Sequence, residues 1–394
     1  MKNWRRLDMR SEWTKKKLSD IADFNPRETI KKGAVAKKIS MDVLRPFYRD
    51  IPYYVEECFS SGTKFRNGDT IMARITPCLE NGKTAQVSIL NDGEVGFGST
   101  EYIVFRAKEG TANKDYLYYL VCSPEVREPA IKSMVGSSGR QRVQTDVVKN
   151  LEIDVPPLVD QEKIGLFLKS FDDKIALNDK INKNLLEQVT ALYKYRFIEL
   201  QPFNGTMPDD WHLGTVSEII ELHDSKRIPL SSRERADLAK IYPYYGATSV
   251  MDYVDRYLFD GIYLLLGEDG TVVDSKGFPI LQYVEGKFWV NNHAHIITGR
   301  NGFSVELLYL LFSLTSVQSI VTGAVQPKIS QANLNKVPVI IPSEAELKAF
   351  DATIQPIFTQ IRNLRAENDR LATTRDTLLP KLMSGELDVS DIDL

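Results

Sequence analysis

The sequence has little cysteine, and its cysteines are not spaced to bind a metal or to build a disulfide framework. Cys58, Cys78 and Cys122 are the only three in 394 residues, and no two of them form a Cys-x-x-Cys pair. Structural zinc sites and disulfide-rich scaffolds both rely on closely spaced pairs. We therefore expect three buried, free thiols in a reducing cytoplasm.

Long apolar runs are missing as well. No stretch approaches the roughly 20 apolar residues of a membrane-spanning helix, and residues 1–30 lack the apolar core of a secretory signal peptide. A composition that is 43% hydrophobic and 26% charged is typical of a soluble globular protein. The length indicates two or three domains. We expect no membrane partner and a cytoplasmic location.

Several catalytic signatures are absent. The sequence contains no GxxxxGK[ST] phosphate loop, no GxSxG elbow, no HExxH helix and no Asn/Asp-Pro-Pro-aromatic methyltransferase motif. "GEDG" (267–270) resembles a phosphate turn, but no Lys-Ser/Thr follows it, so a β-turn is favoured. The paired carboxylates Asp172 and Asp173 are expected on a solvated helix face. The chain is therefore predicted to be non-catalytic and to hold no cofactor of its own.

His293 and His295 form a His-x-His pair in "NNHAH". A strand places both side chains on one face, so a metal-dependent nuclease is one rival function for this chain. No third ligand stands nearby in the sequence. We favour structural hydrogen bonds for the pair and predict no metal site.

The net charge of −3 is distributed unevenly. Residues 1–157 hold 26 Lys and Arg against 21 Asp and Glu, whereas residues 158–394 hold 24 against 32. A basic front half is compatible with a polyanionic partner. The sequence pI near 6.0 argues against a protein that coats nucleic acid through charge alone. Binding to DNA is then expected through local basic patches.

The sequence does contain a repeat. "GRQRVQTDVVKNLEIDVPP" (139–157) and "AVQPKISQANLNKVPVIIPS" (324–343) both run from a basic, Gln-containing phrase through a polar stretch to an apolar run that ends in proline. Pro156 and Pro342 lie 186 residues apart.

A long amphipathic segment follows each proline, with apolar residues at alternating four- and three-residue spacing. The seam has the same phase in both copies, and this spacing over four heptads predicts two helices paired as an antiparallel coiled coil. A helix of about 35 residues spans roughly 50 Å, or about 15 base pairs. The expected pairing residues are Ile164, Leu168, Phe171, Ile175, Asn178, Asn182, Leu185, Val189 and Leu192, and Phe350, Ile354, Ile357, Ile361, Leu364, Asn368, Leu371, Arg375 and Leu378.

Three residues in these helices are unusual. Asn182 and Asn368 occupy the same step of the repeat. Polar seam residues are tolerated near a surface, but a buried Asn also fixes register, and we favour the second interpretation. Pro356 is expected either to kink the second helix or to mark its true start.

The repeat extends backward through both halves. Four pairs of segments resemble each other: 11–24 and 209–222, 51–57 and 242–248, 96–110 and 289–302, and 115–121 and 306–312. Short β-rich runs between Gly and charged turns predict a mixed globule before each helix. The predicted fold is α/β (α+β), with two pseudo-repeated globules separated by two long helices. The expected domains are a first globule (1–157), a first helix (158–200), a second globule (201–342) and a second helix with its tail (343–394).

The chain resembles the specificity (S) subunit of type I restriction-modification systems. The resemblance rests on motifs that occur in order along nearly the whole chain. "GSSGRQRVQ" in the first copy is more basic than its counterpart, and "MPDDW" has Asp-Asp where the family has Glu-Gly. The motifs are "MPDDW" (207–211), "LLLGEDG" (264–270), "FWVNNHAHII" (288–297), "GAVQPKIS" (323–330), "VPPLVDQEKI" (155–164) and "LLPKLMSGEL" (378–387).

The resemblance implies a function and a set of partners. Each globule is a target recognition domain that reads one half of a split site in double-stranded DNA. The helices set the spacing and dock methyltransferase subunits, two of them, which carry S-adenosylmethionine and flip the target base. A restriction and translocase subunit uses ATP and Mg. This chain supplies recognition and no catalysis.

Arg and Gln can pair with guanine and adenine edges, and Lys suits phosphates. The junction residues 140–142 are favoured, because a Gly-flanked basic loop can approach a phosphate closely. For every candidate the alternative is a solvated residue or a turn anchor. The candidates are Arg74, Ser99, Thr100, Arg140, Gln141 and Arg142 in the first globule, and Arg227, Asn292, His293, Gln326 and Lys328 in the second.

A second rival function is a protein-only scaffold. It would use the same helices to join two protein partners, with globules that bind proteins instead of DNA. The acidic rear half favours this scaffold slightly, whereas the basic front half and junction favour DNA recognition.

Overall fold

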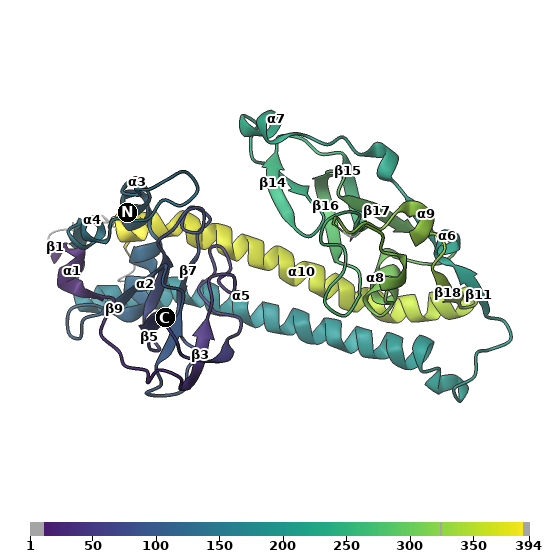
Figure 1. Cartoon of the computed structure of the whole chain (residues 1–394), viewed down its shortest axis with the longest axis horizontal. Helices are drawn as coiled ribbons and strands as arrows, with labels where there is room; N and C mark the ends of the chain where they lie inside the picture. Colours follow the sequence, from purple (N-terminus) through teal and green to yellow (C-terminus); the bar gives the residue numbers. More distant parts are fainter. Residues whose placement is uncertain (1–11, 324, 389–394) are drawn as a thin grey trace, which may run out of the picture. The chain divides into compact units, whose positions relative to one another are not determined.

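The computed structural model describes residues 12–323 and 325–388 (Figure 1). The chain forms two compact units, Met1–Asp179 with Ala366–Leu394, and Lys180–Arg365. Each unit holds one mixed globule and a part of each of two long helices, α5 (Leu158–Tyr193) and α10 (Glu344–Met383). The predicted fold class, two pseudo-repeated α+β globules with two long helices, is confirmed.

The globule of the first unit contains two four-stranded sheets and one separate strand pair. The strand order is β2-β9-β6-β7 in one sheet and β4-β3-β8-β5 in the other, and β1 pairs with β10. Four helices complete this globule. The bounds are β1 Thr14–Lys17, α1 Leu18–Ile21, β2 Ala22–Phe24, β3 Val35–Ile39, β4 Val55–Cys58, β5 Thr63–Phe65, β6 Thr70–Ala73, β7 Thr84–Gln86, β8 Gly96–Gly98, β9 Tyr102–Ala107, α2 Lys114–Cys122, α3 Pro124–Lys132, α4 Thr145–Lys149 and β10 Glu152–Val155.

The globule of the second unit has one six-stranded sheet of order β12-β17-β15-β16-β13-β14, and β11 pairs with β18. Its helices α6, α8 and α9 hold the places of α1, α2 and α4 in the order of elements. The bounds are η2 Lys194–Ile198, η3 Gln201–Phe203, β11 His212–Thr215, α6 Val216–Ile219, β12 Ile220–Leu222, η4 Asp224–Lys226, α7 Ser232–Ala236, β13 Tyr242–Tyr245, β14 Val250–Val254, β15 Phe259–Gly267, β16 Leu281–Val290, β17 Ala294–Gly299, α8 Val305–Ser313, η5 Gln318–Ile320, α9 Gln331–Leu334 and β18 Pro338–Ile341.

The two globules share one topology, and the first differs by breaks in two strands. In the second globule the long strands β15 and β16 are continuous and pair from Phe259 to Leu266. In the first globule β5 and β6 take the place of β15, and β7 and β8 take the place of β16. Because β5 pairs with β8 and β6 pairs with β7, the single sheet becomes two sheets. In both globules one parallel pairing, β3 with β8 or β13 with β16, lies among antiparallel ones.

This topology corrects one of the expected correspondences. Residues 51–57, which resemble 242–248 in sequence, form a loop and the start of β4. The counterpart of β13 is instead β3, because β3 pairs in parallel with β8 as β13 does with β16. The short aromatic phrase common to both segments therefore does not mark equivalent positions of the two globules.

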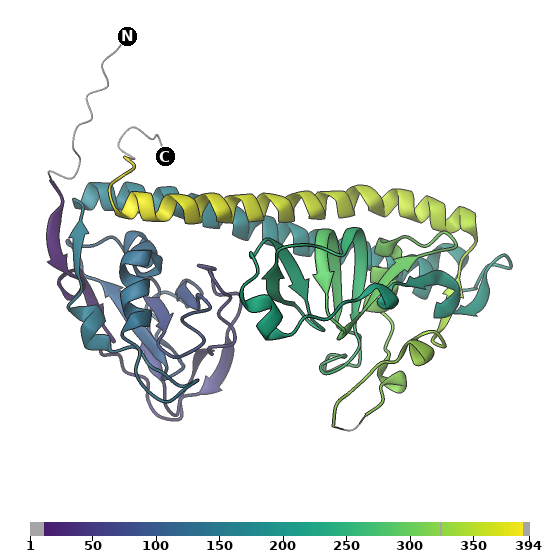
Figure 2. The same cartoon turned by 90° about the horizontal axis from the view of Figure 1, so that it is seen from above.

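In each unit the globule packs on one side of the helix segments (Figure 2). In the first unit, Ile164, Leu168, Leu379, Leu382 and Met383 join the core of the globule. In the second unit, Val189, Phe350, Ile354, Phe358 and Ile361 do the same. The apolar seam of the helices therefore packs on the globules as well as on the opposite helix.

The predicted pairing residues lie at buried or half-buried positions. Ile164, Leu168, Ile175, Ile354, Ile361, Leu364 and Asn368 are buried, and Phe171, Asn182, Leu185, Ile357 and Leu371 are half-buried. Leu192, which the heptad pattern also placed in the seam, is exposed, and Tyr193 is buried instead. A straight helix has 3.6 residues per turn and drifts away from a strict seven-residue repeat. At this end of α5 the buried position is therefore one residue later than the repeat predicts.

One alternative for Pro356 is excluded, and two other expectations are wrong in part. Pro356 does not mark a helix start, since α10 already begins at Glu344, directly after Ser343. Cys58 is exposed on β4, and Cys78 and Cys122 are only half-buried. Asp173 is exposed as expected, but Asp172 is buried because Arg375 and Tyr119 hold its carboxylate.

None of the helices formed by residues 12–323 and 325–388 is long and apolar enough to cross a membrane.

Candidate nucleic-acid interface

The first junction loop (133–143) lies between α3 and α4 and carries three of the candidate DNA-binding residues. An antiparallel bridge between Val135 and Arg142 closes it. Gly136 and Gly139 have φ angles of 138° and 76°, which side-chain-bearing residues rarely adopt. The loop therefore turns tightly and exposes the side chain of Arg140.

Arg142 is held by a carboxylate beside two other candidates. Its Nε and Nη2 donate to the carboxylate of Glu101 at distances of 2.6–3.0 Å. The hydrogen bond from Arg142 lowers the pKa of Glu101, against a smaller opposite effect of burial. Glu101 directly follows Ser99 and Thr100, and the Ser99 hydroxyl accepts a hydrogen bond from the Glu101 N–H. The pairing fixes the Arg142 guanidinium at the start of β9 while leaving it 45% exposed.

Arg74 completes this group from the end of β6. Its backbone N–H donates to Glu101, its carbonyl accepts from Val143, and its guanidinium donates to the Val143 carbonyl over 3.4 Å. The Thr76 N–H in turn donates to the carbonyl of Gln141. The structure thus brings together all six candidates of the first globule, although they are spread from residue 74 to residue 142.

A polar hollow next to this group contains side chains that the sequence analysis did not identify. It measures about 330 Å³, and Lys38, Ser40 and Ser61 line it together with Ser99 and Thr100. Gly62 and Gly98 also border it, and a Cβ on either would lie 2.2–2.3 Å from a backbone oxygen. These glycines let the strands approach closely, and "GFGST" (96–100) was the sequence signal for the hollow.

The described residues of the second junction loop (321–323 and 325–329) have the same construction. An antiparallel bridge joins Thr322 to Lys328, and Gly323 has a φ angle of 88°. Gln326 is exposed within the loop, and Asn292 is exposed in the turn between β16 and β17. Lys328 lies 186 residues after Arg142 and occupies the corresponding place.

The same backbone hydrogen bonds anchor both junction loops to the sheet. In each globule they join the residues after one central strand to the start of the next strand and to the loop. In the first they are Arg74 to Glu101, Val143 to Arg74 and Thr76 to Gln141, and in the second Glu268 to His293, Ile329 to Glu268 and Gly270 to Pro327, the donor N–H named first.

On this shared frame the side chains differ. Arg74 of the first globule corresponds to Glu268 of the second, Glu101 to His293, and Arg142 to Lys328. The first two substitutions change the charge at their positions, and the third replaces a bidentate hydrogen-bond donor with a point charge. Because base edges are read by such donors and acceptors, the two surfaces present different patterns to a ligand.

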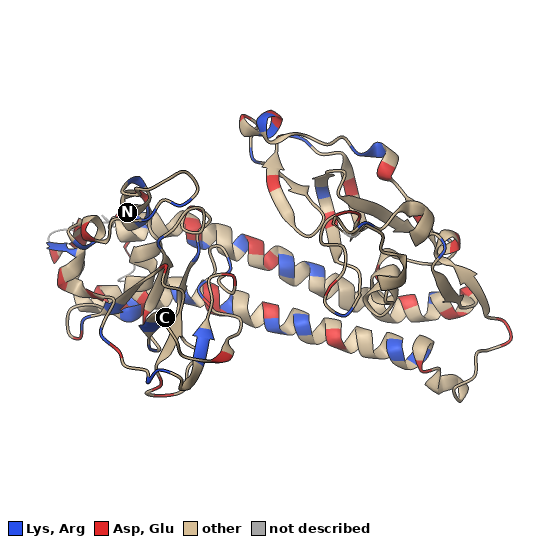
Figure 3. Ribbon diagram, in the orientation of Figure 1, with Lys and Arg blue, Asp and Glu red and all other residues tan. Residues whose placement is uncertain are grey.

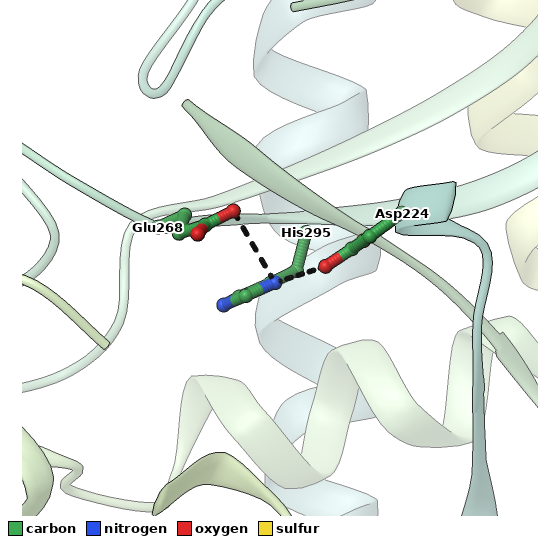
Figure 4. A group of neighbouring side chains, drawn as sticks. All are labelled: Asp224, Glu268 and His295. Atoms are coloured by element: carbon green, nitrogen blue, oxygen red, sulfur yellow. Dashed lines mark hydrogen bonds and ion pairs between the residues drawn. The ribbon is translucent and has the colours of Figure 1, made fainter. Parts of the chain in front are cut away.

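In the second globule a chain of alternating charges runs inward from the junction loop, and we call it the ion cluster: Lys328, Glu268, Arg227, Asp224 and His295. Lys328 contacts Glu268 at 3.2 Å, and Glu268 contacts Arg227 at 2.6 Å. His295 pairs with Asp224 at 2.6 Å and lies 3.7 Å from Glu268 (Figure 4). Burial is the largest single influence and raises the pKa values of Asp224 and Glu268. The hydrogen bonds and charges around them, led by His295 at Asp224 and by Arg227 at Glu268, together outweigh it, so both pKa values are lowered.

The ion cluster explains the contacts of both histidines. His295 is fully buried, with Nδ1 on the Asp224 carboxylate and Nε2 2.8 Å from the Ile329 carbonyl oxygen. Both ring nitrogens are therefore engaged by groups of the protein. His293 instead contacts the Asp269 carboxylate, through Nδ1. The two histidines have different partners, and Gln331, a further donor to Asp224, also holds the cluster.

Asp224, Glu268 and His295 form the metal-like grouping found among the described residues. Two contacts argue against a metal there. The Arg227 guanidinium lies on both carboxylates, at 2.6 Å and 3.5 Å, and occupies the place of a cation. The imidazole also has no ring nitrogen left to ligate. The absence of a metal at His293 and His295 stays a prediction.

Arg227 is placed differently from the other candidates. Its side chain is 13% exposed and donates to Glu268, to the Ala294 carbonyl and to the Asp224 carbonyl. A role in holding the loop is therefore better supported for Arg227 than direct contact with DNA. Sequence reasoning missed Asp224 and Glu268, although "GEDG" marked the turn that holds Glu268.

Charges of both signs are interspersed over both globules (Figure 3). The exposed basic groups of the junction loops are local features, which fits binding through patches more than through a uniformly basic surface.

Comparisons with known proteins agree on one family. The model for the type I restriction modification DNA specificity domain matches residues 10–187 and 208–372. The chain is 25% identical over 311 residues to the type I restriction enzyme MjaIX specificity subunit of Methanocaldococcus jannaschii, covering 72% of this chain and 71% of the relative. It is 21% identical over 468 residues to the HindI specificity subunit of Haemophilus influenzae, covering 96% and 100%.

A solved structure shows the same fold. It is the S subunit of a type I restriction-modification system from M. genitalium, with a TM-score of 0.50 and 17% identity. The match covers 94% of this chain and 96% of the other.

Proposed function

The chain belongs to the type I restriction modification DNA specificity family, and from this premise we propose how its two globules divide the work. The chain is the non-catalytic, DNA-recognising subunit of a type I restriction-modification complex. Each globule reads one half of a bipartite site in double-stranded DNA. The helices α5 and α10 set the spacing between the halves and dock the methyltransferase subunits.

The observation that carries this division is the shared frame with exchanged side chains. Identical backbone hydrogen bonds position Arg74 and Glu268, while their side chains differ in charge. Two readers of the same half-site would have no reason to differ there, because direct readout depends on the donor and acceptor pattern. The two half-sites are therefore different in sequence.

The partners follow from the family. The duplicated helices present two related surfaces, which supports docking of two methyltransferase subunits, one for each repeat. These subunits would bring S-adenosylmethionine, and a restriction subunit would bring ATP and Mg, so this chain needs no cofactor of its own. Modification of cellular DNA places the complex in the cytoplasm.

In the rival function, a protein-only scaffold, the helices play the same part but the globules bind proteins instead of DNA. The DNA specificity family covers both globules, and the junction loops expose Arg140 and Lys328. DNA recognition is therefore preferred, and the scaffold remains the outcome that the following experiment can reveal.

Methylation mapping tests the proposal. The chain is co-expressed with its methyltransferase subunit in a host that lacks the system, and modified bases are located by sequencing. We expect a split motif, two short halves with an unspecified gap, that appears only when this chain is present. A stable protein complex without new methylation, and without affinity for DNA in a titration, would support the scaffold.

A further inference from the structure

A buried group of charges joins the first globule to the helices within the first unit. Arg375 of α10 donates to the carboxylate of Asp172 of α5, and the Tyr119 hydroxyl of α2 donates to the same carboxylate over 2.5 Å. All three are at most 6% exposed. Arg375 also donates to the Phe47 carbonyl of the globule. We call Arg375, Asp172 and Tyr119 the first clamp.

A second salt bridge supports the first clamp. Arg49, which is buried in the loop before β4, donates to Asp173 of α5 over 2.6 Å and to its neighbour Asp50 over 2.8 Å. The paired carboxylates Asp172 and Asp173 thus both hold the globule, each through a different partner.

The second unit has a group of the same chemistry built from other positions. Arg362 of α10 donates to the Tyr283 hydroxyl over 2.6 Å and to Glu306 of α8 over 2.9 Å. The Tyr283 hydroxyl donates to Glu306 over 2.6 Å, and Gln355 of α10 donates to the other Glu306 oxygen. We call Arg362, Glu306 and Tyr283 the second clamp.

The clamps do not descend from matching positions of the repeat. Arg375 and Arg362 lie on the same helix, so the duplication cannot have produced one from the other. The carboxylate comes from α5 in the first clamp and from the globule in the second. Both clamps nevertheless consist of an Arg of α10, a buried carboxylate and a Tyr of the globule. This shared composition at unrelated positions indicates that both units need the same kind of contact between globule and helices.

Stability alone does not account for the clamps. Removing ions from water costs several kcal/mol each, and a buried ion pair often contributes no more than apolar side chains of the same volume. Burial raises the pKa of Asp172 against the attraction of Arg375. The apolar residues around both clamps already supply non-directional adhesion between globule and helices.

Unlike apolar contact, a clamp also restrains the angle at which the globule lies on its helices. Charge-assisted hydrogen bonds weaken steeply when angle or distance changes, whereas apolar contact tolerates sliding and rocking. We propose that the two clamps set the orientation of each globule on its helices and thereby determine how strictly the complex measures the gap between its half-sites. The six residues are positioning residues, and this inference rests on the proposed function.

The test uses the complete complex of this chain with its methyltransferase subunits. DNA duplexes carry both half-sites at the mapped gap, or at gaps longer and shorter by one or two base pairs, and kcat/KM for methylation is measured on each. Two apolar variants replace the clamps, Tyr119→Phe/Asp172→Leu/Arg375→Met and Tyr283→Phe/Glu306→Leu/Arg362→Met. These changes put apolar side chains in place of the polar ones and remove the charges of a clamp together, so neither member of its ion pair stays buried without the other.

We expect wild type to discriminate sharply against altered gaps. Each variant should keep kcat/KM at the native gap within about threefold and lose about tenfold of this discrimination, a difference of roughly 1.4 kcal/mol. The matched control is Glu128→Gln/Lys132→Gln, an exposed pair on α3 that belongs neither to a clamp nor to α5 or α10, and its gap profile should equal that of wild type.

The inference is overturned if folded clamp variants discriminate between gaps as wild type does, or if methylation falls equally at every gap. Should a triple variant fail to fold, Tyr119→Phe and Tyr283→Phe keep the ion pairs and must still broaden the gap profile. A wild-type complex that methylates half-sites regardless of their separation would overturn the proposed function as well, and this result is read before any variant is made.

Discussion

The Asn178 side chain of α5 donates to the side-chain oxygen of Asn368 of α10 over 2.9 Å, in the middle of the helix pair. Asn178 also donates to Glu367 over 3.0 Å, and Asn368 donates to Asp179 over 2.9 Å. Sequence reasoning favoured Asn182 and Asn368 as the register pair. In an antiparallel pair, equivalent positions of the two copies meet only at the symmetry axis, and Asn368 faces Asn178 instead.

Replacing one member of this pair should destabilise the first unit. In Asn178→Leu the buried oxygen of Asn368 loses its donor, which costs about 1–3 kcal/mol. Asn178→Leu/Asn368→Leu should recover that loss, since an apolar layer needs no partner, while the helices gain alternative registers. Thermal unfolding of the chain measures the loss of stability in the single variant and its recovery in the double variant. A single variant as stable as wild type would show that the amide pair does not stabilise the helix pair.

Arg140→Ala should weaken DNA binding by the complex without regard to sequence. An exposed cation on a tight loop suits a phosphate, so the slope of log K against log salt should fall by about 0.9. Titration of specific and unrelated duplexes at several salt concentrations measures this, with Lys183→Gln as a matched exposed control. Unchanged affinity and unchanged salt dependence would remove Arg140 from the interface.

Arg142→Ala should weaken binding more than Arg140→Ala does. Arg142 neutralises Glu101, so its loss leaves a carboxylate facing the phosphates. Arg142→Ala/Glu101→Gln should then recover a part of the affinity. The same titrations decide this, and a double variant weaker than Arg142→Ala would indicate that Glu101 itself contacts a base.

The ion cluster should make the second globule sensitive to acid. The folded-state pKa values of Asp224 and Glu268 are lowered, so their stabilising contribution is present above the ordinary carboxyl pKa near 4 and is lost as pH falls through the lowered values. Glu268→Gln should cost about 1–3 kcal/mol at pH 7, because it removes the closer of the two carboxylates that Arg227 contacts and leaves only that of Asp224, at 3.5 Å. Denaturant unfolding between pH 7 and pH 3 should show this difference shrinking, and a constant difference would contradict it.

The cysteines should react at very different rates with a maleimide. Cys58 is exposed, whereas burial raises the pKa of the Cys122 thiol to about 12 and so keeps the reactive thiolate scarce. At pH 7.5 we expect rapid labelling of Cys58 and slow labelling of Cys122 until the chain unfolds. Cys58→Ser identifies the fast site by mass spectrometry, and rapid labelling of Cys122 in that variant would refute the assignment.

Sequence alone determined the repeat, the two long helices, the alternation of globule and helix along the chain, and the family. These follow from periodicity and from short phrases that recur at fixed separations, such as Pro156 with Pro342. Local patterns of this kind predict elements because hydrophobic spacing and turn chemistry act over a few residues. The break that divides the first sheet was not visible, because strand continuity depends on pairing partners distant in the chain.

Only the tertiary structure decided which charges are used. Asp172 and Asp173 are adjacent and alike in sequence, yet one is buried against Arg375 and the other is exposed. Arg227 was expected on the surface as Arg140 was, but the fold places it between two carboxylates. The ionic role of a side chain depends on neighbours that only folding brings within about 4 Å, and no spacing in the sequence encodes them.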